Sequence, residues 1–148
     1  MEKDNLLLTS IYQNTQTALQ SFHDILPSIK SAALKKECNR QETQYQAIAE
    51  KCEKIAKARR YKLPDNNLVE KMRLWTSIKM SSMMDGSTRH MTEMLLFGTL
   101  MGLTQCIKDS ADYAKSDEEI LTVLKLLETT QEANLEKYKG ILRTTREA

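Results

Sequence analysis

Glycine and proline are scarce in this chain, with 4 glycines and 2 prolines among 148 residues. These two residues interrupt helices and build turns, so their scarcity leaves little room for loops. The β-branched residues also form few runs of the kind that strands need. The sequence therefore excludes a strand-rich fold with many turns and predicts a mostly helical chain.

Cysteine and net charge are low as well. Three cysteines, an odd number, do not form a disulfide framework, and we expect a reducing, cytoplasmic setting. The 22 basic and 20 acidic residues leave a net charge of +2, which does not indicate a nucleic acid or an anionic membrane as partner. The basic cluster Lys57–Lys62 is typical of a helix end, where cations complement the helix dipole. We therefore expect no nucleic-acid partner.

A long apolar run is missing too. The densest apolar run, Met94–Ile107, is shorter than the roughly 20 residues that cross a bilayer. The first residues carry only three consecutive leucines, too few for a secretory signal, so we expect no membrane contact. A helix that is apolar on almost every side is normally buried. This stretch therefore predicts a central core helix, and its Gly98 and Gly102 predict the close approach of another helix.

Helical spacing of apolar residues is what the chain does have. Residues of this kind recur every three or four positions in five segments. The predicted helices span residues 5–26, 31–61, 68–84, 88–113 and 117–142 of a single domain, residues 1–148. Short connections join the first helix to the second and the fourth to the fifth, so each of these pairs is expected to form an antiparallel hairpin. The 68–84 helix would lie in the long link between the hairpins.

Three short stretches carry a resemblance to a known family. They are Ile11-Tyr12-Gln13-Asn14, the run His90-Met91-Thr92-Glu93-Met94 that leads to Gly98 and Gly102, and Asn134-Leu135-Glu136-Lys137. In these stretches and in its helix lengths the chain resembles the ferritin-like superfamily, and in particular small uncharacterised bacterial proteins of that fold. The expected fold is an all-α, ferritin-like four-helix bundle. It would consist of two antiparallel hairpins and a long crossover that contains an extra, shorter helix.

A degenerate metal site is one alternative for the function. Ferritin-like di-metal proteins use a Glu from each of two helices and a Glu-x-x-His from each of the other two. This chain has no Glu-x-x-His, and it has Gln16, Tyr45 and Gln131 where ligands are expected. The remaining candidate ligands for iron, manganese or zinc are Glu42, His90, Glu93 and Glu128, with His90 and Glu93 in reversed order. We expect no other cofactor.

A structural role is the other explanation for the same polar residues. Amide and hydroxyl groups on a bundle seam hydrogen-bond across helices and fix their register. The predicted polar core consists of Gln16, Gln41, Tyr45 and Gln131. A non-metal pocket lined by such groups is a third alternative.

Catalytic residues are not predicted. The two histidines, His23 and His90, do not suggest a Ser/His/acid arrangement, and the chain has no glycine-rich phosphate loop. Met72 and Trp75, in the 68–84 segment, are the predicted contact of a homodimer or other homo-oligomer. The sequence thus favours a non-catalytic cytoplasmic bundle that acts through self-association or partner binding, with a metal-binding ferritin-like protein as the alternative.

Overall fold

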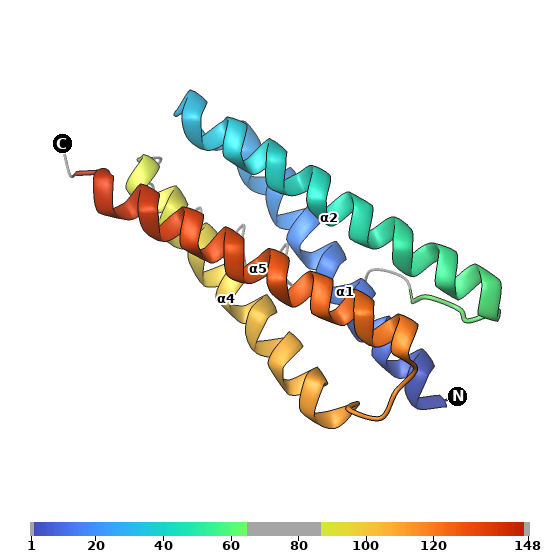
Figure 1. Cartoon of the computed structure of the whole chain (residues 1–148). Coiled ribbons are helices and arrows are strands. Elements are labelled where there is room, and N and C mark those ends of the chain that lie inside the picture. The colour runs from blue at the N-terminus through green and yellow to red at the C-terminus, as the bar shows by residue number, and fades with distance from the viewer. Residues whose placement is uncertain (1, 65–86, 147–148) are drawn as a thin grey trace.

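The computed structural model describes residues 2–64 and 87–146, and within them the chain is an all-α four-helix bundle (Figure 1). The helices are α1 (Glu2–Ile25), α2 (Ala32–Arg59), α4 (Thr88–Asp112) and α5 (Glu118–Thr144), and the short 3-10 helix η1 (Leu26–Ser28) follows α1. The predicted bounds of these four helices differ from the observed ones by at most three residues. The predicted helix 68–84, with Met72 and Trp75, lies outside the described residues.

Local signals explain where the helices begin and end. Pro27 lies in η1 and ends α1. The side chains of Ser31, Ser87 and Asp117 each accept a hydrogen bond from a backbone N–H of the first turn of α2, α4 and α5. Arg60, with a left-handed φ of 59°, ends α2. These local features fix the ends of the helices.

The two hairpins, α1–α2 and α4–α5, pack side by side, with α1 next to α4 and α2 next to α5. Arg59 at the end of α2 hydrogen-bonds to Asp117, which caps α5 (2.8 Å). Near the start of α1, the Ser10 hydroxyl donates to Asp109 near the end of α4 (2.6 Å). These contacts show that α2 and α4 run in the same direction, so α2 ends at one end of the bundle and α4 begins at the other (Figure 1).

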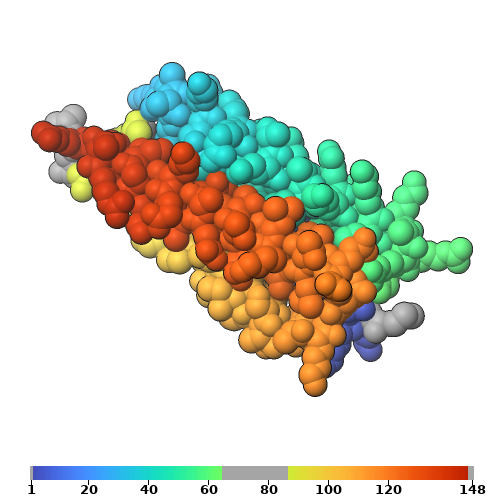
Figure 2. Space-filling model, in the orientation of Figure 1, coloured from blue at the N-terminus to red at the C-terminus, as the bar shows by residue number. Residues whose placement is uncertain are grey.

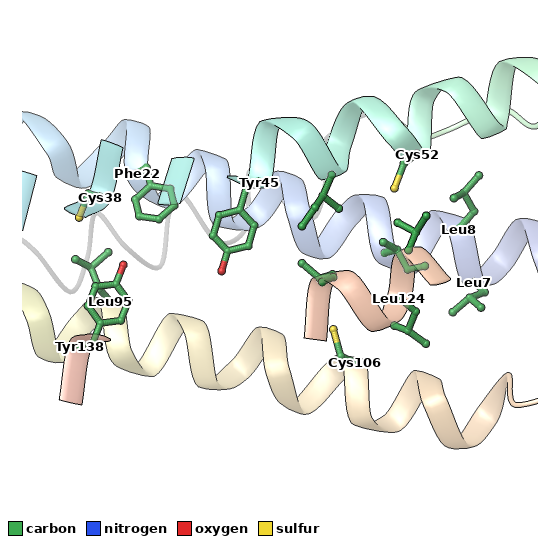
Figure 3. Packing of buried hydrophobic residues seen from close by; sticks show 14 of the residues in the cluster. Leu7, Leu8, Phe22, Cys38, Tyr45, Cys52, Leu95, Cys106, Leu124 and Tyr138 are labelled. Carbon is green, nitrogen blue, oxygen red and sulfur yellow. The ribbon is translucent and has the colours of Figure 1, made fainter. Parts of the chain in front are cut away.

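The core is one apolar cluster to which all four helices contribute. Figure 3 shows labelled members of it, such as Leu7, Cys52 and Leu124, between the helices. The rings of Phe22 on α1 and Tyr45 on α2 lie 5.8 Å apart and are tilted by 42°, a favourable aromatic geometry. Aromatic contact thus adds to apolar burial in holding the first hairpin together.

The prediction that α4 is the central, buried helix is wrong. Its side chains Phe97, Leu100, Met101 and Ile107 are between 45% and 57% exposed. By contrast, no residue of α1 from Leu7 to Phe22 is fully exposed. Apolar content alone did not reveal this arrangement, because the other described helices contact only part of the circumference of α4, and its outer side keeps apolar residues. In Figure 2, α5 covers the space between α2 and α4, and α4 lies at the edge of the molecule.

None of the described helices is long and apolar enough to cross a membrane.

Candidate functional site

A buried polar layer joins α1, α4 and α5. Gln131 on α5 donates its side-chain N–H to Asn14 Oδ1 on α1 (3.0 Å) and accepts from the Cys106 thiol on α4 (3.2 Å). Asn14 in turn donates to the backbone carbonyl of Gly102 (2.9 Å). The absence of a side chain at Gly102 makes room for this layer, because a Cβ there would collide with the ends of Gln131 and Asn14. Three helices are therefore fixed to one another at this level.

Two further buried polar contacts join α2 to α5. The Tyr138 hydroxyl donates to Gln41 Oε1 (2.5 Å), and Gln41 donates its own N–H to Glu37 (2.9 Å). One turn further along, Asn134 donates to the Tyr45 hydroxyl oxygen (3.4 Å). Buried polar groups that are satisfied in this way favour one register of the helices over others.

The predicted polar-core residues fall into two groups. Gln41, Tyr45 and Gln131 are buried and take part in these contacts. Gln16 is half-buried on α1 and interacts with the neighbouring Tyr12 instead. The predicted polar core did not include Asn14, Tyr138 or Asn134, although Asn14 and Asn134 stand in stretches that carried the family resemblance.

Another unassigned polar residue is Asp109, which is only 3% exposed. Its carboxylate accepts hydrogen bonds from Ser10 on α1 (2.6 Å) and from Gln105 on its own helix (2.9 Å). Buried carboxylates need such partners because the loss of hydration is costly. The pattern of the sequence offered no signal for this pair, because the residues lie 99 positions apart. The contact anchors α1 to α4.

A cleft of about 590 Å³ opens between α1 and α4, directly beside the polar layer. Its floor includes Phe22, Tyr45 and Tyr138, and small residues such as Ala18 and Gly98 form its walls. No described residue that lines the cleft carries a charged side chain. The volume lies within the usual range of ligand pockets, about 300–1,000 Å³. The lining favours an uncharged, largely apolar guest.

Gly98 and Gly102 play different roles in this cleft. A Cβ at Gly98 would meet no atom within 4 Å, whereas a Cβ at Gly102 would meet Gln131 and Asn14. The predicted close approach therefore occurs at Gly102 alone, and the side chains of Gln131 and Asn14 make the contact there. At Gly98 the missing side chain leaves part of the cleft empty.

The candidate metal ligands do not form a donor set in the described part of the chain. No group of three or more His, Cys, Asp or Glu side chains that could hold a metal ion occurs among residues 2–64 and 87–146. Glu42 follows Gln41 and so lies at the level of Tyr138, and roughly 15 Å of helix separates Tyr138 from Glu128 on α5. Glu128 accepts from Lys125 (3.3 Å). His90 and Glu93 lie in the first two turns of α4.

The three thiols are poor nucleophiles. Burial raises the pKa of Cys38, Cys52 and Cys106 to about 12 in each case. Burial likewise raises the pKa of Tyr45 to about 12. Because the thiolate is the reactive form, these cysteines remain protonated and inert near neutral pH.

The four exposed apolar side chains of α4 form a second feature, which we call the outer α4 face: Phe97, Leu100, Met101 and Ile107. Phe97 lies three positions from Leu100 and four from Met101, and Leu100 lies seven positions from Ile107, so the four share one side of the helix. Single exposed apolar residues are common, but a contiguous group of them marks an interaction site in many proteins.

No protein-family model, no curated protein and no solved structure matches this chain. What the structure shows is a four-helix all-α bundle, and the resemblance to the ferritin-like superfamily stays a prediction from the residues.

Proposed function

We propose that this protein is a non-catalytic, cytoplasmic helical bundle that acts through self-association or through binding of a partner protein. The observation that carries the proposal is the outer α4 face, where four large apolar side chains are about half exposed. Leaving such a row in water forgoes the stabilisation of burying it, about 25 cal/mol per Å² of apolar surface. A second protein surface placed against this face would recover that free energy.

The chemistry of the interior supports a binding role. The thiols are held protonated by burial. Among the described residues, Asp109 is the buried carboxylate, and two donors already satisfy it. The cleft has no charged lining residue in the described chain that could transfer a proton. The free cysteines also suit a reducing cytoplasm.

We further propose that the bundle is of the ferritin-like type. The parallel course of α2 and α4 supports this, because the second helix of one hairpin and the first helix of the other also run parallel in the ferritin-like variant of the bundle. The metal-binding alternative has less support, since Glu42, His90, Glu93 and Glu128 do not converge among the described residues. Elemental analysis after incubation with Fe(II), Mn(II) and Zn(II) tests it. Near-integral metal that is lost in a Glu93→Ala, Glu128→Ala double variant would support that alternative.

A second candidate function is the binding of an uncharged small molecule. The specific observation in its favour is the cleft between α1 and α4, with its aromatic floor and neutral polar walls. A guest with an apolar body and one neutral polar end would match this lining.

Gel filtration of a clarified extract from the producing cells tests the main proposal. We expect the wild-type protein to elute at an apparent mass above that of its 17.0 kDa monomer. The double variant Phe97→Ser, Leu100→Ser should elute as a monomer, because it removes half of the outer α4 face. Leu126→Ser, which alters an exposed leucine on α5, is the matched control and should leave the elution position unchanged. A wild-type protein that elutes as a monomer would contradict the proposal.

A further inference from the structure

Arg89 and Asp112, at the two ends of α4, carry charges of the sign that the helix dipole disfavours. The positive end of a helix dipole lies at the N-terminus and is stabilised by acidic residues, and the C-terminus is stabilised by basic ones. In α4 the first turn has no acidic residue and the last turn has no basic residue. Arg89 stands at the beginning, and Asp112 is the last residue of the helix. The dipole of α4 therefore does not account for these two charges.

These charges lie on the same side as the outer α4 face. Arg89 and Glu93 precede Phe97 by eight and four positions, and Lys108 and Asp112 follow Thr104 by four and eight. Steps of four keep residues on one side of a helix. Arg89, Lys108 and Asp112 are exposed and Glu93 is half-buried. Within the described chain none of the four forms an ion pair.

The resulting surface has an apolar centre between two charged ends. Along α4 the charges are positive at Arg89, negative at Glu93, positive at Lys108 and negative at Asp112. In a second α4 that runs in the opposite direction, each of these charges meets one of the opposite sign. If a second α4 lies across the first in the antiparallel direction, Arg89 faces Asp112 of the other copy and Glu93 faces its Lys108. In the same antiparallel arrangement, Phe97 lies opposite Thr104 of the other copy and Leu100 lies opposite its Met101. A parallel arrangement would instead place each charged residue next to the same residue of the second chain, which carries the same charge. The pattern thus selects both the partner and its direction.

We infer that the outer α4 face binds a second copy of this chain, with the two α4 helices antiparallel about a two-fold axis near Leu100 and Met101. This inference rests on the proposed function and names the partner. Two-fold symmetry is the commonest form of homo-oligomer, and it uses each contact twice. The four complementary ion pairs at the rim would set the orientation, and the apolar centre would supply the affinity.

Sedimentation equilibrium of the purified full-length protein tests the inference. The wild-type mass should approach twice 17.0 kDa as the concentration rises. The single variants Glu93→Lys and Lys108→Glu each turn two attractive pairs into repulsive ones, and each should weaken dimerisation by about tenfold. The double variant Glu93→Lys, Lys108→Glu restores opposite charges across the axis and should restore the wild-type dissociation constant. An equimolar mixture of the two single variants should dimerise as well as the wild type.

The control is Lys51→Glu, which makes the same charge reversal at an exposed position of α2 and should not change the dissociation constant. Circular dichroism of each variant verifies that the bundle remains folded. A wild-type mass of 17.0 kDa at all concentrations would overturn the inference, as would a dimer that both single reversals leave intact or that the double variant fails to restore. If the purified protein is monomeric while its size in the extract depends on Phe97 and Leu100, the second-copy inference is wrong and the proposed function stands.

Discussion

Gln131 on α5 reaches over Gly102 on α4 so closely that position 102 has no room for a side chain. We expect Gly102→Ala to push Gln131 away from Asn14 and Cys106 and to break a buried hydrogen bond. Gly98→Ala is the matched control, because it gains the same helix propensity and meets no atom. The free energy of unfolding should be lower in Gly102→Ala than in Gly98→Ala by about 1–2 kcal/mol. Urea denaturation measures it, and equal values would contradict this explanation.

The hydrogen bond from Tyr138 to Gln41 should contribute to stability. Tyr138→Phe leaves the buried Gln41 Oε1 without its donor, and we expect a loss of about 1–2 kcal/mol. A double-mutant cycle with Gln41→Leu should give a coupling energy of about 1 kcal/mol. Tyr113→Phe is the control: that ring is half-buried, and its hydroxyl has no hydrogen bond to another described residue. A coupling energy near zero would show that the contact is not formed in solution.

The buried thiols should make the protein sensitive to alkaline pH. Their pKa values are raised to about 12 in the folded state, and a thiol in the unfolded chain has a pKa of about 8.5. The unfolded state therefore loses protons first as the pH rises, and stability falls between about pH 8.5 and pH 12. Each thiol should contribute a slope of roughly 1 kcal/mol per pH unit in that range.

Chemical denaturation from pH 8 to pH 10 measures this slope in the wild type and in Cys52→Ala. We expect the variant to be less stable at pH 8 but to have the shallower slope. Leu8→Ala, which also creates a cavity but removes no titratable group, should keep the wild-type slope. If Cys52→Ala and Leu8→Ala show the same slope, the thiol does not titrate as stated.

The cleft between α1 and α4 should bind an uncharged apolar probe. Nile red, whose fluorescence rises in apolar surroundings, is suitable because the described lining has no charge. Gly98→Met would fill the cleft without a clash, since a Cβ at Gly98 meets nothing within 4 Å, and should weaken the dye affinity several-fold. Gly140→Met occupies equally open space on α5 and should leave the affinity unchanged. If both substitutions change the dye affinity equally, the dye binds outside the cleft.

Much of the fold could be predicted because its signals are local. The apolar repeat placed the helices within a few residues, and Ser31, Ser87 and Asp117 cap three of them in the structure. The start of α1 was predicted too late. Asp4, whose residue type is typical of helix caps, lies inside the first turn of α1 and accepts from the backbone N–H of Asp117 (2.9 Å). This contact joins residues 113 positions apart, so the local pattern around residue 4 does not reveal it.

The candidate site was less predictable because it depends on which helices become neighbours. Gln41 and Gln131 were identified by their positions on seams, yet their partners Tyr138 and Asn14 lie 97 and 117 positions away. The exposure of Phe97 and Leu100 depends on how much of α4 the other helices cover. Periodicity indicates which side of a helix is apolar, and it does not indicate how much of that side finds a partner.

The three buried cysteines lie at separate levels of the bundle. Cys38 is in the second turn of α2, Cys52 is in its second half, and Cys106 belongs to the layer that joins α1, α4 and α5. A protonated, enclosed thiol reacts with an alkylating reagent only while the structure around it is open. The rate of modification at each sulfur would therefore report how often that level of the bundle opens. The native cysteines therefore allow local unfolding to be measured at three levels of the bundle without an added label.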